Sequence, residues 1–142
     1  MRVSSRVLSR VLSRLIGVLL AVVLGLAALS MVFSEWGEVV VIRPLGVESP
    51  SETRVWIVEL PGGAYLRGGH GPGWAESAVM AGRASLRRDG VWQDYRIFDV
   101  PGARARDRVN AAMAAKYGFS DRFIGWTRDV ETTRPLRLEP IP

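Results

Sequence analysis

The chain has 142 residues, a length that suits one ordinary domain. It contains no cysteine and a single histidine, His70, which excludes disulfide scaffolds, zinc ribbons, iron–sulfur clusters and multi-histidine metal centres built within one chain. The first 14 residues hold four arginines and no acid, whereas the remaining 15 basic residues nearly balance the 14 acidic ones, so the net charge of +5 belongs mainly to the N-terminus. The nearly neutral remainder argues against a nucleic-acid partner.

Residues 15–33 form a stretch of 19 residues without a charge. As a helix they would extend about 28 Å, which is close to the hydrocarbon thickness of a bilayer. A buried soluble helix is the alternative, but so small a domain has too little chain to cover every face of it. The sequence therefore predicts a transmembrane helix over residues 15–33, with the lipid bilayer as its partner and residues 1–14 as a basic cytoplasmic leader.

The charges on either side of this segment predict its orientation. Four arginines precede it, and Glu35 and Glu38 follow it. The positive-inside rule then places the N-terminus in the cytoplasm and residues 35–142 outside the cytoplasmic membrane, as a single-pass protein. Residues 28–30 also offer a small-x-small cleavage pattern for export after signal removal, although the apolar stretch exceeds the usual signal length of about 7–15 residues.

From residue 35 onward, short apolar runs alternate with turn residues. β-branched and alternating patterns predict strands over residues 39–42, 54–60, 64–67 and 136–138. The clearest signal is a hairpin of residues 85–88 and 91–98 around Asp89 and Gly90, a pair suited to a two-residue turn with positive φ. With about six strands and two or three helices, the predicted fold class is α+β, a small barrel or half-barrel.

Two or three helices are expected in this body, the third being residues 119–127, which are either a short helix or irregular. Residues 74–84 predict a short one. Asp99 predicts the cap of a longer one, with Pro101 in its first turn, apolar residues at helical spacing, and Gly118 as its left-handed terminator.

The glycine-rich loop of residues 68–73 is the strongest candidate for a binding site. At a strand-to-helix junction, its backbone N–H groups and the neighbouring Arg67 suit a phosphate, which presents several oxygens and tolerates no bulky side chain between them. A flexible solvent loop is the alternative. The spacing matches neither the dinucleotide fingerprint nor the P-loop.

Three residue groups near this loop and in the later helix have both a functional and a structural interpretation. His70 would need an orienting partner to act as an acid or base, and the sequence supplies none. Trp74 suits stacking on a flavin ring, or equally a core anchor at the start of a helix. Residues 116–118 suit anion binding, or equally a helix end with a favourable charge.

These elements together resemble an uncharacterised bacterial family related to the flavin- and deazaflavin-binding split β-barrels, the superfamily of pyridoxamine-phosphate oxidases and deazaflavin-dependent nitroreductases. The resemblance covers nearly all of residues 38–139 and none of the apolar segment. It rests on the order and spacing of Ile42-Arg43, the strand from Val55 to Val58, residues 64–74, the hairpin, and residues 133–138.

The resemblance implies a split barrel that binds FMN or a deazaflavin, with a reductase activity and a homodimer as further implications. The cofactor would lie on Arg67, Gly69, His70, Gly71 and Trp74, with the phosphate on the loop and the ring near Trp74. One departure stands out, because residues 48–53 hold no basic residue where the deazaflavin enzymes usually carry them. The alternative is a cofactor-free interaction or scaffold domain of the cell envelope, which the predicted topology favours.

Overall fold

A computed structural model describes residues 5–34, 37–48, 50–126 and 129–142, and within the first helix the side chains of residues 13–29. The chain divides into two compact units, Met1–Ser34 and Glu35–Pro142. The first unit is the helix α1 (Ser5–Ser34). Its described apolar side chains are exposed, among them Leu19 and Leu24 at 65% and 61%.

Across the described residues, no helix is both long enough and apolar enough to cross a membrane. The predicted transmembrane helix is therefore not supported by the structure. Residues 30–33 of that predicted span, and most of the predicted basic leader, lie outside the residues whose side chains are described.

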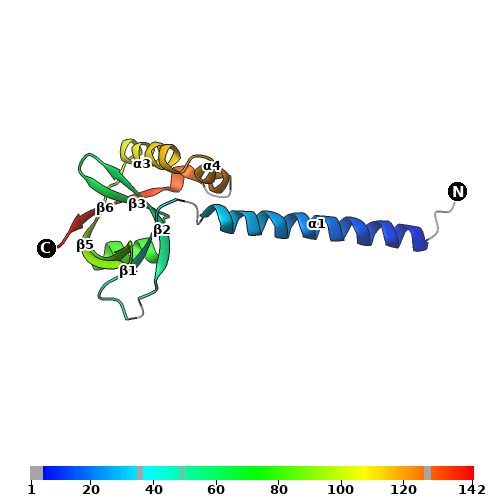
Figure 1. The fold of residues 1–142 in the computed structure, drawn as a ribbon, viewed down its shortest axis with the longest axis horizontal. Coiled ribbons are helices and arrows are strands. Elements are labelled where there is room, and N and C mark those ends of the chain that lie inside the picture. The colour runs from blue at the N-terminus through cyan, green and yellow to red at the C-terminus, as the bar shows by residue number, and fades with distance from the viewer. Residues whose placement is uncertain (1–4, 35–36, 49, 127–128) are drawn as a thin grey trace. The chain divides into compact units, whose positions relative to one another are not determined.

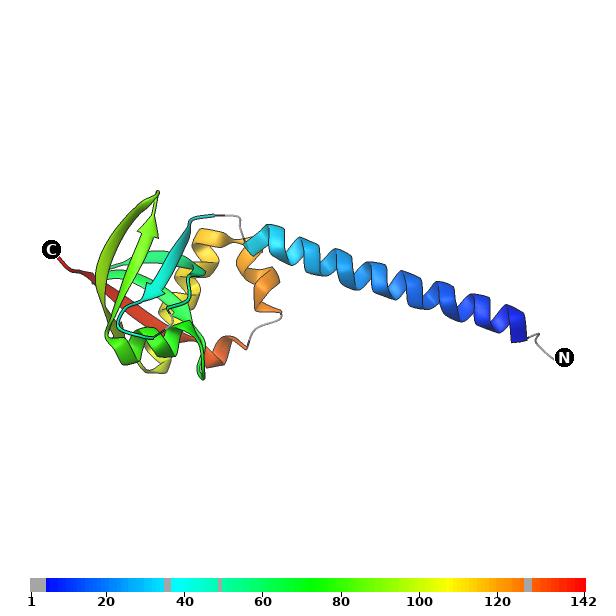
Figure 2. The same cartoon turned by 90° about the horizontal axis from the view of Figure 1, so that it is seen from below.

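Within its described residues, the second unit forms six strands, three α-helices and one short 3-10 helix, which confirms the predicted α+β class. The strands are β1 (Val39–Pro44), β2 (Thr53–Leu60), β3 (Gly63–Gly68), β4 (Arg83–Arg88), β5 (Val91–Asp99) and β6 (Arg134–Pro140). They pair antiparallel in the order β1-β2-β3-β6-β5-β4 and close into a barrel through the β1–β4 pair. Figure 2 shows β6 beside the β4–β5 hairpin, as their register requires.

The β4–β5 hairpin has the predicted turn. Arg88 pairs with Val91, so Asp89 and Gly90 form a two-residue loop, with φ values of 51° and 82°. Both angles lie in the left-handed region that this turn type requires, and Asp and Gly are residues that enter it at low cost.

Two apolar clusters stabilise the unit. The first fills the barrel and includes residues from the strands and two small residues of α2 (Trp74–Ala81), namely Val40, Ile42, Val55, Ile57, Leu66, Ala75, Ala78, Ala84, Leu86, Ile97, Leu136 and Leu138. The second lies between α3 (Ala103–Tyr117) and the outer side of β2, where Val58, Val109, Met113 and Tyr117 are buried. In Figure 1, α3 lies beside β3, and α2 lies near β1 and β5.

Two predicted helix limits are wrong. The helix predicted over residues 74–84 ends at Ala81, because Gly82 takes a left-handed φ of 64° and Arg83 already belongs to β4. Asp99 does not cap the long helix. It ends β5, Val100 N–H donates to the Pro135 carbonyl at 3.1 Å beyond it, and the helix begins at Ala103 after Gly102.

The end of α3 lies where it was predicted, because Gly118 follows its last residue and its N–H donates to the Ala114 carbonyl at 2.9 Å. Gly118 has a positive φ of 55°, but its ψ of −118° differs from that of the predicted left-handed conformation. The short helix α4 (Phe119–Gly125) and the 3-10 helix η1 (Val130–Thr132) lead from there to β6. This path brings the start of β6 back to the N-terminus of α3.

Candidate functional site

A pocket of about 210 Å³ lies where the loop after β3, the end of β5, the N-terminus of α3 and the start of β6 meet. The lining includes two cationic side chains, Arg106 and Arg134, and two anionic ones, Asp99 and Glu131, so these four formal charges cancel. The complete lining is His70, Asp99, Pro101, Gly102, Ala103, Arg106, Glu131, Thr133, Arg134 and Pro135.

Arg134 is the most buried charged group of this pocket, with 12% of its side chain exposed. Its Nη2 donates to Asp99 Oδ2 at 2.8 Å, and its Nη1 donates to Glu76 of α2. The hydrogen bond to Asp99 raises the pKa of the Arg134 guanidinium, and burial opposes this in part. The guanidinium is thus held between two carboxylates, while its buried Nε has no hydrogen-bond partner among the described residues.

Thr133 presents a second polar group without a partner. The residue is 5% exposed and lines the pocket, and its Oγ1 makes no hydrogen bond within the described part of the chain. Leaving a buried hydroxyl unsatisfied costs about 1–3 kcal/mol. Thr133 and Arg134, adjacent residues that both line this pocket, therefore each have a buried polar atom without a partner in the described chain.

The N-terminus of α3 also contributes to the pocket wall. Its preceding residue is Gly102, which has no side chain to cap the helix and takes a φ of 108° that favours glycine. The first turn contains no acidic residue and instead holds Arg104 and Arg106. Because the first N–H groups of a helix have no partner inside it and carry partial positive charge, this end favours an acceptor or an anion.

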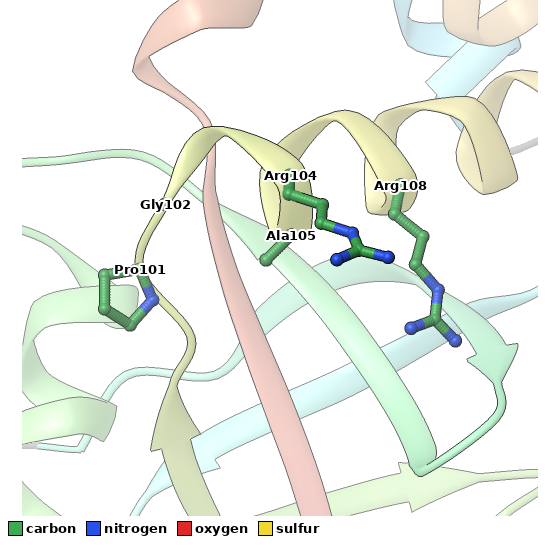
Figure 3. Close-up of a pocket in the computed structure, with 5 residues that line it drawn as sticks. All are labelled: Pro101, Gly102, Arg104, Ala105 and Arg108. Atoms are coloured by element: carbon green, nitrogen blue, oxygen red, sulfur yellow. The ribbon is translucent and has the colours of Figure 1, made fainter.

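A larger and more open pocket of about 490 Å³ borders the same helix end. It is lined by Pro101, Gly102, Arg104, Ala105 and Arg108, and shares its first two residues with the smaller pocket. Figure 3 shows the Arg104 and Arg108 side chains extending from α3 in the same direction. Arg108 Nη2 donates to the Pro61 carbonyl at 3.1 Å, which fixes this guanidinium over the β2–β3 turn.

Arg67, a predicted phosphate ligand, lies on the side of β3 that faces α3 and α4. Its Nη2 forms an ion pair with Asp121, and its Nη1 lies 3.5 Å from Asn110 Oδ1. The two charged side chains are 7% and 12% exposed. The guanidinium is thus already bound inside the protein.

Trp74, the predicted ring-stacking residue, packs against the cluster inside the barrel. Arg67 and Trp74 therefore lie on opposite faces of the barrel wall, and the structure does not bring them together. Gly68 allows α2 to pack closely against β3, because a Cβ on this residue would lie 2.5 Å from the Ala75 Cβ.

The remaining predicted site residues are in the exposed loop. Gly71 has a φ of 93°, a conformation that favours glycine, while Gly69 has open space around its Cβ position. His70 lines the 210 Å³ pocket. Of the five predicted site residues, His70 alone is among the lining residues of this pocket.

The structural interpretation of residues 116–118 is the one the structure supports. Lys116 Nζ donates to Glu38 Oε2 at 2.6 Å and to the Ile57 carbonyl at 2.7 Å. The Tyr117 ring stacks on Trp56 at 4.4 Å between centroids, and its hydroxyl accepts from Ile57 N–H at 3.1 Å. This group joins the end of α3 to the barrel.

Sequence reasoning missed Thr133 and Arg134 as site residues. Both belong to the segment 133–138 that carries the resemblance, but neither lies in a glycine-rich loop, and more than 60 residues separate them from His70. Only the β3–β6 pairing, in which Gly68 lies opposite Arg134, brings the start of β6 beside that loop.

Solved structures with this fold include HutZ, the heme storage protein from Vibrio cholerae, with 14% identity over 78% of this chain and 86% of that chain, and a TM-score of 0.58. A second is a "Putative Pyridoxamine 5'-phosphate oxidase" from Listeria innocua, with 10% identity, coverage of 79% and 90%, and a TM-score of 0.56. A third has 17% identity, 82% coverage of both chains and a TM-score of 0.52. No family model and no curated protein sequence matches the chain.

At such low identity the likeness shows the fold. The second unit shares the barrel fold of these solved structures, and the barrel predicted from the sequence is confirmed as a fold.

Proposed function

We propose that this domain binds a flavin-type cofactor, FMN or a deazaflavin, at the rim of the barrel between His70 and the N-terminus of α3. The observation that carries the proposal is that Thr133 and Arg134, two residues that line one small pocket, each have a buried side-chain polar atom without a hydrogen-bond partner in the described chain. Support also comes from the fold, which a heme storage protein and a protein named for pyridoxamine 5'-phosphate share.

The dimensions of the site limit which part of a cofactor it can hold. A pocket of about 210 Å³ is smaller than the roughly 300–1,000 Å³ that a drug-sized ligand usually occupies. It therefore takes one polar end of the cofactor. The adjoining 490 Å³ pocket, which shares Pro101 and Gly102, offers the remaining volume.

In this arrangement the chain's residues bind and orient the cofactor. Thr133 and Arg134 hold the polar end, and the first turn of α3 supplies N–H donors. Arg104 and Arg108 face the outer part. A bound flavin or deazaflavin supplies electron or hydride transfer, so a reductase activity belongs to this proposal.

The test is a titration of the full chain with FMN, with the deazaflavin cofactor and with riboflavin, followed by flavin fluorescence. We expect saturable binding of a phosphate-bearing cofactor with one site per chain. The Arg104→Gln and Arg108→Gln double variant should bind more weakly, and an Arg83→Gln and Arg96→Gln variant of exposed strand arginines provides the matched control. An absence of saturable binding to each cofactor rejects the proposal.

Heme is the second candidate ligand, because HutZ is a heme storage protein and His70, the single histidine, lies on the pocket wall. Imidazole is a common axial ligand of heme iron. A Soret band that appears with heme and shifts in His70→Ala would favour this ligand over a flavin.

The cofactor-free alternative, an interaction or scaffold domain of the envelope, is favoured by a specific observation. Two of the five predicted cofactor contacts have internal roles, since Arg67 is paired with Asp121 and Trp74 packs on the barrel core. Failure of flavin and heme to bind would leave this function as the better one.

For the first unit we propose the lipid bilayer as the partner of residues 15–33. The proposal concerns binding to lipid and rests on the uncharged sequence and the exposed apolar side chains, such as Leu19 and Leu24. This proposal includes the predicted location at the cytoplasmic membrane, with the domain outside. The alternative is export of the domain after signal cleavage. Membrane fractionation of the full chain, compared with its Leu19→Lys and Leu24→Lys variants, tests lipid binding. The mass of the mature chain distinguishes a retained anchor from export after cleavage.

The homodimer also remains a proposal, and it accompanies the cofactor-binding function. Light scattering of the full chain with and without FMN tests it. A doubled mass in the presence of cofactor is the expected result, and an unchanged monomer contradicts it.

A further inference from the structure

The helix α4 and the residue that follows it carry a row of aromatic side chains. Phe119, Phe123 and Trp126 have the i, i+4 and i+7 spacing that places side chains along one face of a helix. The ring centroids are 6.3 Å apart between Phe119 and Phe123, and 5.9 Å apart between Phe123 and Trp126. Trp126 is 82% exposed and Phe119 is 57% exposed, so both ends of this aromatic row are open to solvent.

The opposite face of α4 is bound to the barrel. Ser120 and Asp121 are buried, and Asp121 forms the ion pair with Arg67 of β3. This ion pair holds the helix in an orientation in which the aromatic row points away from the barrel. Arg122, the other charged residue of α4, is exposed and adjoins the row by helical geometry. The outer face of α4 therefore combines aromatic rings with a cation.

This combination of side chains matches the interface of a lipid bilayer. Tryptophan is enriched at the level of the lipid headgroups, because its ring is apolar while its indole N–H can still reach a polar partner. A cationic side chain at the same depth is attracted to anionic headgroups. The chemistry of the outer face of α4 is thus that of a surface that binds lipid.

The chain connection holds α4 close to any bilayer that contains residues 15–33. Four Cα-to-Cα steps lead from the end of that segment to Gly37, and they extend about 14 Å at most in any conformation. Gly37 lies against the Tyr117 ring, where an added Cβ would be 2.5 Å from Cδ1, and the Tyr117 hydroxyl lies 2.8 Å from the Glu38 carbonyl oxygen. Tyr117 ends α3, and Phe119 begins α4 two residues later. The first turn of α4 is therefore tethered near the lipid surface.

We propose that the aromatic row of α4 is a second membrane contact, made by the folded domain. In this contact, Trp126 and Phe119 enter the headgroup region of the bilayer, and Arg122 binds an anionic headgroup. The inference rests on the lipid bilayer as the proposed partner of residues 15–33. It goes beyond that proposal because a second contact restricts the domain to one orientation on the membrane.

The test uses the full chain bound to vesicles of phosphatidylcholine and phosphatidylglycerol with bromine on the acyl chains close to the headgroup. Bromine quenches tryptophan fluorescence only at short range. We expect Trp126→Phe to lose a quenched component of the emission that the matched control, Trp92→Phe on β5, retains. Arg122→Gln, or vesicles of phosphatidylcholine alone, should reduce the quenching of Trp126. Because Trp126 is so exposed, Trp126→Phe should leave the urea midpoint unchanged, which shows that this variant is folded.

Sedimentation with the same vesicles separates this inference from the proposal on which it rests. A chain that sediments with the vesicles, but whose quenching is unchanged by Trp126→Phe, keeps the bilayer as the partner of residues 15–33 and overturns the contact through α4. A chain that does not sediment with the vesicles overturns both. Self-association that Trp126→Ser abolishes, without quenching of Trp126 by the lipid, would make the aromatic row an interface between two copies and would also overturn the membrane contact.

Discussion

Arg67 of β3 and Asp121 of α4 form an ion pair that is almost removed from solvent, with 7% and 12% of the two side chains exposed. The residues are 54 positions apart in the chain. The pair connects the barrel wall to the helical layer, with Asn110 of α3 at 3.5 Å from the same guanidinium. In this position the Arg67 guanidinium is bound inside the protein by the Asp121 carboxylate.

Arg67→Met should therefore destabilise the fold, because it leaves the Asp121 carboxylate buried without its partner. We expect a loss of about 3 kcal/mol in the free energy of unfolding, measured by urea denaturation. Adding Asp121→Asn should recover part of the loss. Arg96→Met is the matched control, since the Arg96–Glu139 pair at 3.6 Å is exposed and should cost less than about 1 kcal/mol. Equal effects of the two single substitutions would contradict the structural role.

Gly68→Ala should destabilise the barrel by about 1–3 kcal/mol, because the new Cβ would lie 2.5 Å from the Ala75 Cβ and push α2 outward. Gly69→Ala is the control, since its Cβ meets no atom within 4 Å. Urea midpoints measure both. Ala75→Gly should restore the Gly68→Ala variant, and a failure to do so would show that the close helix contact is not the cause.

Tyr117→Phe keeps the stack on Trp56 but removes the hydroxyl that Ile57 N–H contacts at 3.1 Å. The buried N–H then lacks its acceptor, and we expect a loss of about 1–3 kcal/mol. Tyr95→Phe, whose hydroxyl contacts Gln93 at an exposed position, should have little effect. Similar losses in both variants would argue against the buried network.

The Tyr117 hydroxyl also predicts a dependence on pH. Burial raises the pKa of this phenol above its ordinary value of 10.0. A raised pKa in the folded state gives stability that is complete below pH 10 and is lost as the pH rises through the folded value. Stability curves at alkaline pH should therefore fall less steeply for Tyr117→Phe than for the natural chain.

Glu38 predicts the opposite dependence on the acid side. Burial raises the pKa of its carboxyl, but hydrogen bonds from Lys116 and Arg88 outweigh this and hold the pKa below its ordinary 4.5. Its contribution is present above pH 4.5 and is lost as the pH falls through the lower folded value. Glu38→Gln should flatten this part of an acid denaturation curve, whereas the exposed Glu139→Gln should not. Parallel curves for the natural chain and Glu38→Gln would contradict the ion-pair network.

Local signals predicted the fold well. The Asp89–Gly90 turn, the strand patterns and the Gly118 helix end depend on neighbouring residues, and each is where the sequence indicated. The prediction that Asp99 caps α3 was wrong. Its carboxylate accepts a hydrogen bond from Arg134, a residue 35 positions away in the chain, which the local sequence does not indicate.

The candidate site was less predictable because it depends on barrel closure. Arg67 pairs with Asp121 because its side chain lies on the side of β3 where α4 places that carboxylate. A prediction from the local sequence does not contain this information. The unpartnered Thr133 hydroxyl gives no signal in the sequence, since an isolated threonine before a strand is common. His70, which lines the pocket, could be predicted as a candidate because it belongs to a glycine-rich loop after a strand, and such loops are often exposed and functional.

The most direct test of the account is a map of amide chemical shifts in the ¹⁵N-labelled full chain during titration with FMN. The account predicts that the largest changes lie at residues 103–105 and at Thr133 and Arg134, with saturation at one FMN per chain. Changes centred on Arg67 and Asp121, or no saturable change anywhere, would contradict it.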